Sequence, residues 1–387
     1  MRLTTESRAP ARSETPQGPT VPIAWTRVVR WALVGTLAML VLVLVDVQRN
    51  GGGNPVSLVQ PGTNGSATRL FQHDFPELEQ PEADGLDGQL YYAIAKDPFH
   101  LDHTAKYLDH PRYRYQRPLL PWLGWALHPG GGGIGMVLAL VGVTLVGLML
   151  GGIALGAFSM MLRGPAWAGA LFAITPGAYW SLRVTVSDAL ALALAIGAVA
   201  LAARSHHAPA IAVGVLAVLA KEPVILVFIG WGVFRRTRRD VLLVVLPGAA
   251  VAAWMAWLRL QLPPDAPRSQ DIGLPFMGLW DAWHQVWSQG HELVGMACTV
   301  GGLVIGILAL SVRGVRHPLG WIMAVQLGFL LVMGVNPTAT NFGGTRMAMP
   351  VMVFGVLALL TPRATEPQGA TDLQGSTDPL ALTASAG

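Results

Sequence analysis

A short polar stretch holds the carboxylate best placed for chemistry in this chain. The run from Gly85 to Tyr92 sets Asp87 between two glycines and just before a pair of tyrosines that begins at Tyr91. Glycine allows close backbone approach, and tyrosine rings offer flat faces that suit sugar rings. A carboxylate in such surroundings can act as a general base toward a hydroxyl group. Asp84, three residues earlier, is the nearest second acid.

Charged residues beside later apolar runs form a second group of candidates for substrate binding. They are Arg117, Arg183, Asp188, Lys221, Glu222 and Arg346. An ionisable group at membrane depth costs free energy, so its presence there suggests a function. A cluster of cations would bind a lipid phosphate or pyrophosphate. Simpler roles stay open: Arg183 can pair with Asp188, and Arg346 can mark a membrane boundary. Lys221 and Glu222 can form a pair that reaches toward the headgroups.

The composition places the chain among membrane proteins. Of 387 residues, 52% are hydrophobic and only 12% are charged, against about 25% charged in soluble domains. The basic residues behind the net charge of +4 are scattered through short loops, which argues against nucleic acid as a partner. Cys298 is the single cysteine, so neither an intrachain disulfide nor a thiolate metal cluster can form, and we assign no metal ligands.

Apolar runs predict an all-α polytopic protein with about ten transmembrane helices. Residues 28–47 form the first anchor, 48–117 a large extracytoplasmic loop that carries Asp87, and 118–362 a multi-helix membrane domain. The later runs cover 134–160, 165–180, 187–203, 208–220, 223–234, 241–262, 293–312, 318–335 and 347–360. Residues 1–27 and 363–387 are too polar to bury a core, which predicts disordered cytoplasmic tails.

Two short apolar runs around Lys221 predict a hairpin of half-length helices over 208–234. Pro223 breaks the helical hydrogen-bond ladder, and two charges at mid-membrane would be costly. The hairpin also keeps the arginine cluster at 235–239 in the cytoplasm, as the positive-inside rule requires. A single longer helix over the same residues is the competing interpretation.

Aromatic residues before the eighth run predict an amphipathic outer helix near 275–289. Phe276, Trp280, Trp283 and Trp287 recur at spacings of four, three and four, which places them on one helical face. Such a helix is typical of the headgroup layer, where it anchors the protein or guides a lipid tail.

The stretch from Gly85 to Ala95, together with Tyr113 to Pro121, resembles a bacterial branch of the GT-C membrane glycosyltransferases. Its Asp-Gly-Gln-x-Tyr-Tyr element is also similar to the Trp-Asp-x-x-x-Tyr stretch of mannosyltransferases in GPI-anchor synthesis, with Leu in place of Trp. A looser similarity covers 186–190, 219–223 and Arg346 before the final helix.

This resemblance implies an enzyme of the plasma (inner) membrane with both termini in the cytoplasm. It would transfer a sugar, mannose or arabinose-like, from a polyprenyl-phosphate donor to a cell-envelope glycan or glycolipid acceptor on the extracytoplasmic face. Asp87 would be the general base of an inverting reaction, with Asp84 the nearest second acid. The resemblance assigns the leaving phosphate to Arg117, Lys221 and Arg346, and the sugar or acceptor to Gln89, Tyr91 and Tyr92. It leaves the second acid and a divalent-metal requirement open.

Two other functions compete with the enzyme. A transporter or flippase for a lipid-linked saccharide also needs a charged cavity, but transporters often carry broken helices in corresponding positions of two repeats. This sequence has one broken pair, at Lys221, and no second copy. The third candidate is a non-catalytic subunit for assembly of cell-surface glycopolymers.

Overall fold

In the part of the chain that the structure describes, five helices are long and apolar enough to cross a membrane. They are α1 (Trp25–Asn50), α7 (Ile134–Met161), α13 (Arg238–Gln261), α15 (Leu293–Arg313) and α18 (Asn341–Leu360). At 1.5 Å per residue even the shortest reaches about 30 Å, the thickness of a hydrocarbon core. Lipid offers the backbone no hydrogen-bond partners, so these runs satisfy their amides within helices. The computed structural model describes residues 22–79, 81–266 and 271–362.

The predicted tails fall largely outside the described residues, which exclude 1–21 and 363–387. The predicted boundary at residue 27 is wrong, because α1 already begins at Trp25. Arg27 and Arg30 lie in the first turns of α1, before its apolar part. They are tolerated there because a long arginine side chain can reach water from the end of a membrane helix.

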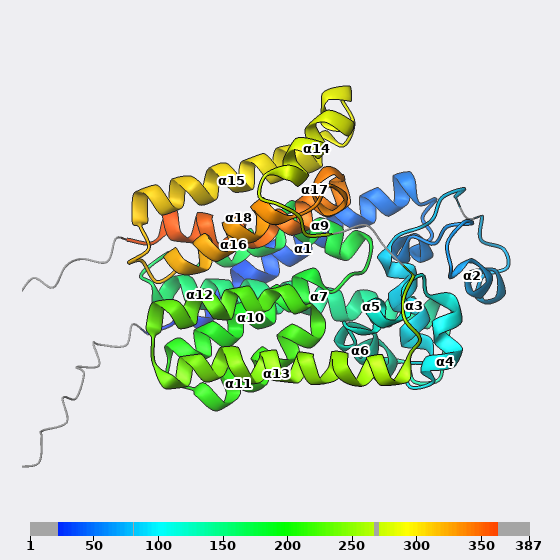
Figure 1. The fold of residues 1–387 in the computed structure, drawn as a ribbon, viewed down its shortest axis with the longest axis horizontal. Helices are drawn as coiled ribbons and strands as arrows, with labels where there is room; N and C mark the ends of the chain where they lie inside the picture. The colour runs from blue at the N-terminus through cyan, green and yellow to red at the C-terminus, as the bar shows by residue number, and fades with distance from the viewer. Residues whose placement is uncertain (1–21, 80, 267–270, 363–387) are drawn as a thin grey trace, which may run out of the picture.

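Shorter helices fill the space between the long ones (Figure 1). They are α8 (Ala168–Ala173), α9 (Pro176–Arg183), α10 (Asp188–Ala203), α11 (His207–Ala220), α12 (Ile225–Arg235) and α16 (Gly320–Val332). The run expected over 165–180 is therefore two helices rather than one. Pro176 disfavours the helical conformation of the residue before it, and the Thr175 side chain accepts from the backbone N–H of Ala178 to begin α9.

The helical run is interrupted at Lys221, which has extended backbone angles and lies between α11 and the 3-10 turn η3 (Glu222–Val224). Lys221 is ion-paired with Asp188 at the beginning of α10. Further along, Trp231 of α12 packs edge-on against Phe158, near the end of α7. Helix α7 begins near Asp188, at the cap end of the bundle, and finishes at the opposite end. Helix α12 therefore runs from the cap end, at Lys221, to the opposite end.

Residues 51–127 form a helical cap at one end of the bundle (Figure 1, right). Its elements are η1 (Pro55–Val59), α2 (Thr68–Asp74), α3 (Asp87–Lys96), α4 (Leu101–Thr104), η2 (Ala105–Tyr107), α5 (Pro111–Tyr115) and α6 (Leu119–Leu127). Tyr92 ties this cap to the bundle. Its hydroxyl donates to Asp74 Oδ2 at 2.7 Å and accepts from the N–H of Gly133, before α7, at 2.6 Å. Lys96 completes the cluster with an ion pair of 2.6 Å to Asp74.

The predicted amphipathic helix near 275–289 is shorter than expected and its aromatic face is interrupted. Helix α14 spans Met277–Gln285, and Trp280 and Trp283 on it are exposed. Trp287 instead lies in the 3-10 turn η4 (Trp287–Gln289), buried, with Nε1 donating to the carbonyl of Ala339 in α17 (Val335–Ala339) at 2.9 Å. The periodicity fails here because this hydrogen bond holds Trp287 against α17.

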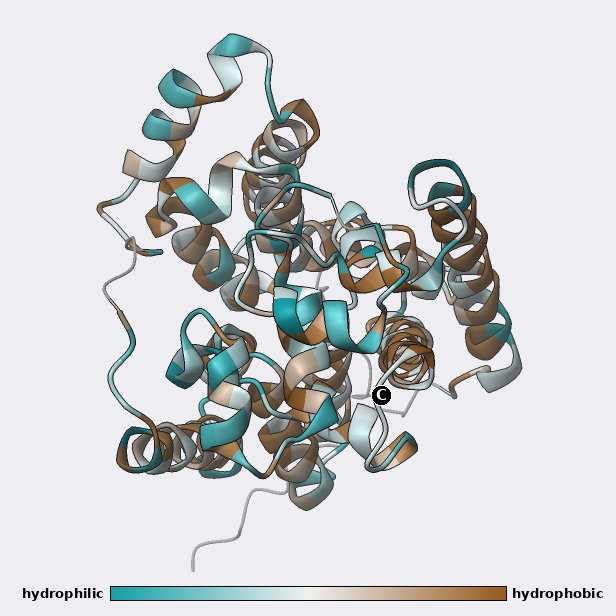
Figure 2. Ribbon diagram, turned by 90° about the vertical axis from the view of Figure 1, so that its right-hand side faces the viewer, coloured by the Kyte–Doolittle hydropathy of each residue, from teal (hydrophilic) through white to brown (hydrophobic). Residues whose placement is uncertain are grey.

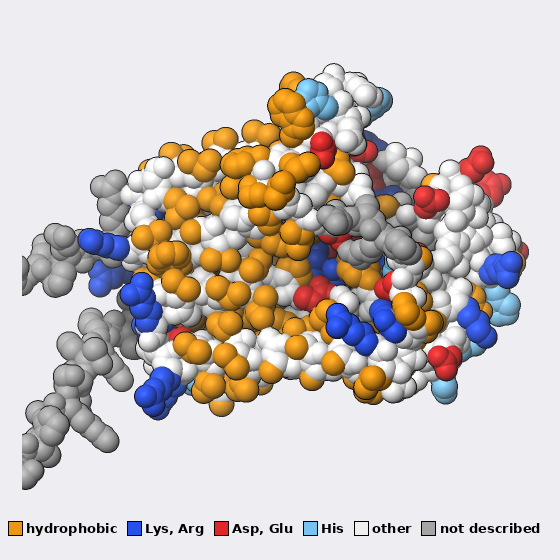
Figure 3. All heavy atoms as spheres, in the orientation of Figure 1, with side chains coloured by type: hydrophobic (Ala, Val, Ile, Leu, Met, Phe, Trp, Pro, Cys, Tyr) orange, Lys and Arg blue, Asp and Glu red, His pale blue; other side chains and the backbone are white. Residues whose placement is uncertain are grey.

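The surface polarity agrees with a membrane protein. Figure 3 shows a broad belt of hydrophobic side chains, with Lys and Arg at the end opposite the cap and charged side chains of both signs on the cap side. Figure 2 views the molecule from the cap end, where hydrophilic segments lie in front of largely hydrophobic helices. Within the described ranges no β-strand forms, and a single isolated bridge joins Ile272 to Met333.

The glycine after Asp87 sets how closely α3 can approach its neighbours. A Cβ at Gly88 would lie 2.0 Å from the carbonyl oxygen of Val184 and 2.8 Å from that of Val59. Both are backbone atoms, which cannot rotate away. We therefore expect Gly88→Ala to displace α3 and to lower the thermal midpoint of the detergent-purified protein. Gly142→Ala in α7 is the control, because its Cβ meets no atom within 4 Å; equal midpoints for the two variants would contradict this packing argument.

Candidate functional site

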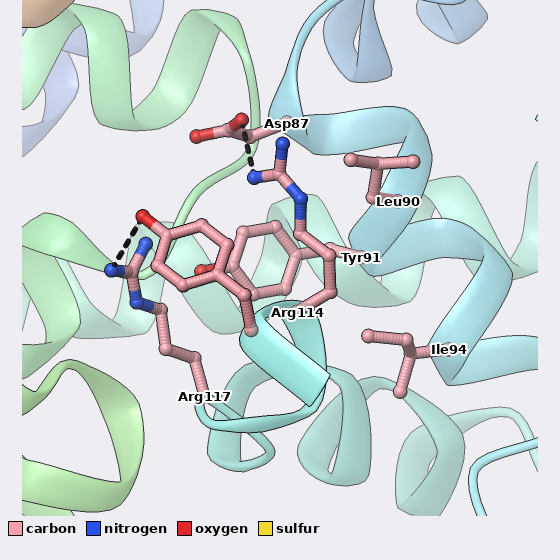
Figure 4. A pocket seen from close by; sticks show the side chains of 7 residues that line it. Asp87, Leu90, Tyr91, Ile94, Arg114 and Arg117 are labelled. Atoms are coloured by element: carbon pink, nitrogen blue, oxygen red, sulfur yellow. Dashed lines mark hydrogen bonds and ion pairs between the residues drawn. The ribbon is translucent and has the colours of Figure 1, made fainter. Parts of the chain in front are cut away.

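Asp87 is the first residue of α3, and two arginines from distant parts of the chain hold its carboxylate. Arg114 Nη1 lies 2.8 Å from Asp87 Oδ1, as Figure 4 shows, and Arg346 Nη1 lies 3.2 Å from Oδ2. Arg114 comes from α5 in the cap, whereas Arg346 comes from α18 in the bundle. The carboxylate therefore lies where the cap meets the membrane domain.

A second carboxylate, Asp188, lies on the other side of Arg346. Its Oδ1 is 3.6 Å from Arg346 Nε and is also ion-paired with Lys221. The Nε of Arg346 is buried and has no hydrogen-bond partner among the described residues, while the Phe342 ring lies 3.7 Å below its guanidinium carbon. Arg346 thus joins the two carboxylates, with Nη1 toward Asp87 and Nε toward Asp188.

Arg117 connects the end of the cap to the break at Lys221. Its Nε lies 3.0 Å from Glu222 Oε2, and its Nη2 donates to the hydroxyl of Tyr113 at 3.0 Å (Figure 4). Tyr91, one helical turn after Asp87, shares a hydrogen bond of 2.9 Å with Ser187 Oγ beside Asp188. These contacts bring the Asp87 face of α3 against the beginning of α10.

The ion-paired cluster contains equal numbers of cations and carboxylates. The cations are Arg114, Arg117, Lys221 and Arg346, and the carboxylates are Asp87, Asp109, Asp188 and Glu222. Every cation in it is already paired, so an incoming anion would have to compete with a carboxylate for each arginine or lysine.

Burial and charge act in opposite directions on Asp87. Burial by itself would raise the pKa of this carboxyl, but Arg114, Arg346 and Arg117 outweigh it and hold the pKa well below its usual range. Asp87 is therefore ionised at neutral pH. Burial raises the pKa of Tyr91 to about 12, so its phenol stays protonated and can donate a hydrogen bond.

The cluster borders a cavity of about 420 Å³. Its charged lining includes Asp87, Arg114, Arg117, Lys221 and Arg346, together with Asp109 and Asp271. A smaller cavity continues from Asp188, Lys221 and Arg346 toward the apolar side chains of Leu192 and Val227. The larger cavity therefore offers both cations and carboxylates to a ligand, whereas the smaller one, of about 40 Å³, has room only for a small group beside Arg346.

The structure brings together six of the charged residues singled out from the sequence, along with Tyr91. The charged ones are Asp87, Arg117, Asp188, Lys221, Glu222 and Arg346.

Four other candidates lie elsewhere. Arg183 turns away from Asp188 and pairs with Asp46 of α1, also donating to the carbonyl of Ser57. Gln89 is buried, and its Nε2 donates to the backbone carbonyl of Asp84, whose own side chain is in an exposed segment. Tyr92 belongs to the Asp74 cluster. Asp87 and Tyr91 share a face because they are four residues apart on α3, whereas Gln89 and Tyr92 lie on other faces.

Arg114 belongs with Arg112 and Arg117 to the cations that end the large loop, but its ion pair with Asp87 was not predicted from the sequence. Arg114 Nη2 also lies 2.7 Å from Asp109 Oδ2, and this second ion pair helps to keep the buried guanidinium charged. Its place in the same short basic stretch as Arg117 was the available signal. Arg112 faces the other way and donates to the carbonyl of Leu262 at the end of α13.

Within residues 22–79, 81–266 and 271–362, no three His, Cys, Asp or Glu side chains group as metal ligands. Comparisons of the chain with models of protein families, with curated proteins and with solved structures give no match.

The two neighbouring tyrosines of α3 should behave differently when mutated. Tyr92→Phe removes a donor to Asp74 and an acceptor for the Gly133 N–H, which leaves two groups short of a partner. We expect a loss of about 1–3 kcal/mol in unfolding free energy. Tyr91→Phe removes one bond to a hydroxyl that can rotate, with an expected loss of about 0.5–1.5 kcal/mol. Thermal unfolding in detergent measures both, and a larger effect for Tyr91→Phe would contradict these assignments.

Proposed function

We propose that this protein is a membrane glycosyltransferase of the GT-C type. It transfers a sugar from a polyprenyl-phosphate donor to a glycan or glycolipid acceptor. One observation carries the proposal: an ionised carboxylate, Asp87, lines the same cavity as Arg117, Lys221 and Arg346. A base for a hydroxyl and cations for a phosphate are the two groups that glycosyl transfer from a lipid phosphate requires.

In the proposed reaction the acceptor hydroxyl attacks the anomeric carbon of the donor sugar. Asp87 takes the hydroxyl proton as the new carbon–oxygen bond forms. The bond between the anomeric carbon and the phosphate oxygen breaks, and the polyprenyl phosphate leaves with that electron pair. Attack opposite the leaving group inverts the anomeric configuration. Arg117, Lys221 and Arg346 stabilise the charge that develops on the phosphate.

The ion pairs also explain how a carboxylate with a low pKa can serve as a base. While Arg114 and Arg346 hold Asp87, proton transfer to it is unfavourable. A donor phosphate that draws Arg346 toward itself removes one stabilising cation from Asp87 and raises its basicity. In this proposal Asp188 and Glu222 keep Lys221 and Arg117 in position until the phosphate binds, and Asp84, Gln89, Tyr92 and Arg183 have no part in the chemistry.

The proposal includes a plasma-membrane topology with about ten passes, both termini in the cytoplasm and Asp87 outside. Its support is the reversal of the chain at Lys221, which returns Arg235 and the arginines that follow to the end opposite the cap. Helices α11 and α12 are too short to cross alone and would form a half-length hairpin.

Replacement of Asp87 separates the enzyme from its competitors. Purified protein in detergent, supplied with radiolabelled polyprenyl-phosphate sugars and a panel of acceptor glycans, should form labelled product. Asp87→Asn should reduce turnover by about 10²-fold or more, because general-base catalysis contributes on this scale. Asp84→Asn is the matched control and should keep near-normal turnover, since its side chain lies in an exposed segment.

Unchanged turnover in Asp87→Asn, with folding verified by thermal unfolding, would rule out Asp87 as the base. Net movement of the lipid-linked sugar across liposomes without transfer would instead favour the flippase.

The dependence of activity on pH tests the role of Arg346. Asp87 must be ionised to act, and its low folded-state pKa keeps it ionised until the pH is well below about 4. Arg346→Gln removes one of the charges that lower this pKa, so the acid limb of kcat/KM should move to higher pH. Arg183→Gln is a control arginine of similar burial, and its acid limb should match the wild type. An unshifted limb in Arg346→Gln would contradict the coupling.

A further inference from the structure

A second cavity shares none of its lining residues with the Asp87 cavity. It has a volume of about 500 Å³ and lies between α1, the connection from α8 to α9, and the adjoining ends of α15 and α18. Its apolar lining consists of Met39, Leu42, Val45, Ile174, Pro176, Trp180 and Val294. From Met39 to Asn50 it follows α1 for about 16 Å, which is roughly half of a bilayer core of about 30 Å. The groove thus has the depth of one leaflet.

The cap end of this groove is polar and carries a net positive charge. Asp46 is neutralised by its ion pair with Arg183 and accepts from Asn50 Nδ2 at 2.6 Å. Arg49 also lines the groove, is exposed, and forms no ion pair in the described part of the chain. The side chains of Tyr179 and Asn341 border the same end. One unneutralised cation at the polar end of a leaflet-deep groove complements a lipid phosphate.

A polar cavity of about 390 Å³ adjoins this end and shares Asn50 with the groove. Its lining includes Asn54, Gln60, Glu79 and Arg183, the partner of Asp46. Amide and carboxylate groups of this kind can exchange hydrogen bonds with hydroxyl groups. An apolar groove, a cation and a hydroxyl-binding cavity therefore follow one another along α1 and η1.

We propose that this series is a binding site for one anionic glycerophospholipid of the leaflet at the cap end, distinct from the Asp87 site. One acyl chain occupies the groove, the phosphate contacts Arg49 and Asn50, and a hydroxylated headgroup such as glycerol enters the polar cavity. The proposal does not depend on the glycosyltransferase activity, because no residue of the Asp87 cluster takes part.

Photocrosslinking tests this site in the full-length protein. The chain is reconstituted in nanodiscs of phosphatidylcholine with a trace of phosphatidylglycerol that bears a diazirine on one acyl chain. After irradiation, mass spectrometry should locate the label in residues 39–50 and 174–180. Unlabelled phosphatidylglycerol should compete, whereas additional phosphatidylcholine should not. Arg49→Gln should reduce the preference for phosphatidylglycerol by about fivefold, the effect of one surface cation.

Two leucines of α1 give a matched pair for the groove itself. Leu42 lines it and is 52% exposed, whereas Leu44 does not line it and is 53% exposed. Leu42→Trp should fill the groove and reduce labelling several-fold, and Leu44→Trp should leave labelling unchanged. Because both substitutions add an exposed aromatic ring to the same helix, a difference between them does not arise from general destabilisation.

Three results would overturn the proposal. Equal labelling in Leu42→Trp and Leu44→Trp would mean that ordinary boundary lipid covers α1. Equal competition by phosphatidylcholine would remove the anionic specificity. Competition by polyprenyl phosphate but not by phosphatidylglycerol would assign the groove to a different lipid class. None of these results would bear on transfer by Asp87, which is measured by product formation.

Discussion

The guanidinium of Arg346, placed between Asp87 and Asp188, is the interaction on which the candidate site depends. It joins the cap to α10 and α18, although Asp87 and Arg346 are 259 residues apart in the chain. A charge buried among helices is tolerated only when it is paired, and removal of one partner from such a pair costs about 3–5 kcal/mol. Two ion pairs cross from the cap to the bundle, Asp87 with Arg346 and Arg117 with Glu222, so docking of the cap completes the charged cluster.

Internal pairing also determines which ligands the cluster can accept. Four cations and four carboxylates satisfy one another, so a neutral sugar gains little by displacing them. A phosphate brings enough negative charge to compete for Arg346 and Arg117 in a site of low dielectric. The same competition frees Asp87 from a cation. Recognition of the phosphate and activation of the base would then be linked through the shared arginine, without any movement of the helices.

The sequence predicts part of this arrangement, because charges in an apolar chain must be paired. That rule singled out Asp188, Lys221 and Arg346. It could not choose the partner of Arg183, since both Asp188 and Asp46 were available and the fold decided between them. The long apolar runs likewise predict α1, α7 and α13, in which length alone fixes the helix. Short segments such as α8 and α9 depend on local chemistry at Thr175 and Pro176, and on packing that a hydrophobic pattern does not contain.

The different orientations of Arg183 and Asp188 have a structural cause in the turn between them. Thr185 has a positive φ of 55°, and its hydroxyl donates to the carbonyl of Leu58. This hydrogen bond holds the turn against η1. On one side of this turn Arg183 points toward Asp46 and the polar cavity. On the other, Asp188 faces Arg346 and the smaller cavity that the two residues line together. The backbone of Val184 packs directly against Gly88, which follows Asp87, so the turn also contacts the beginning of α3. The groove along α1 and the Asp87 cavity share no lining residue, and the helices that bring cations to Asp87 are α5, through Arg114, and α18, through Arg346. The turn at Thr185 thus separates two sets of charges that the sequence places only five residues apart.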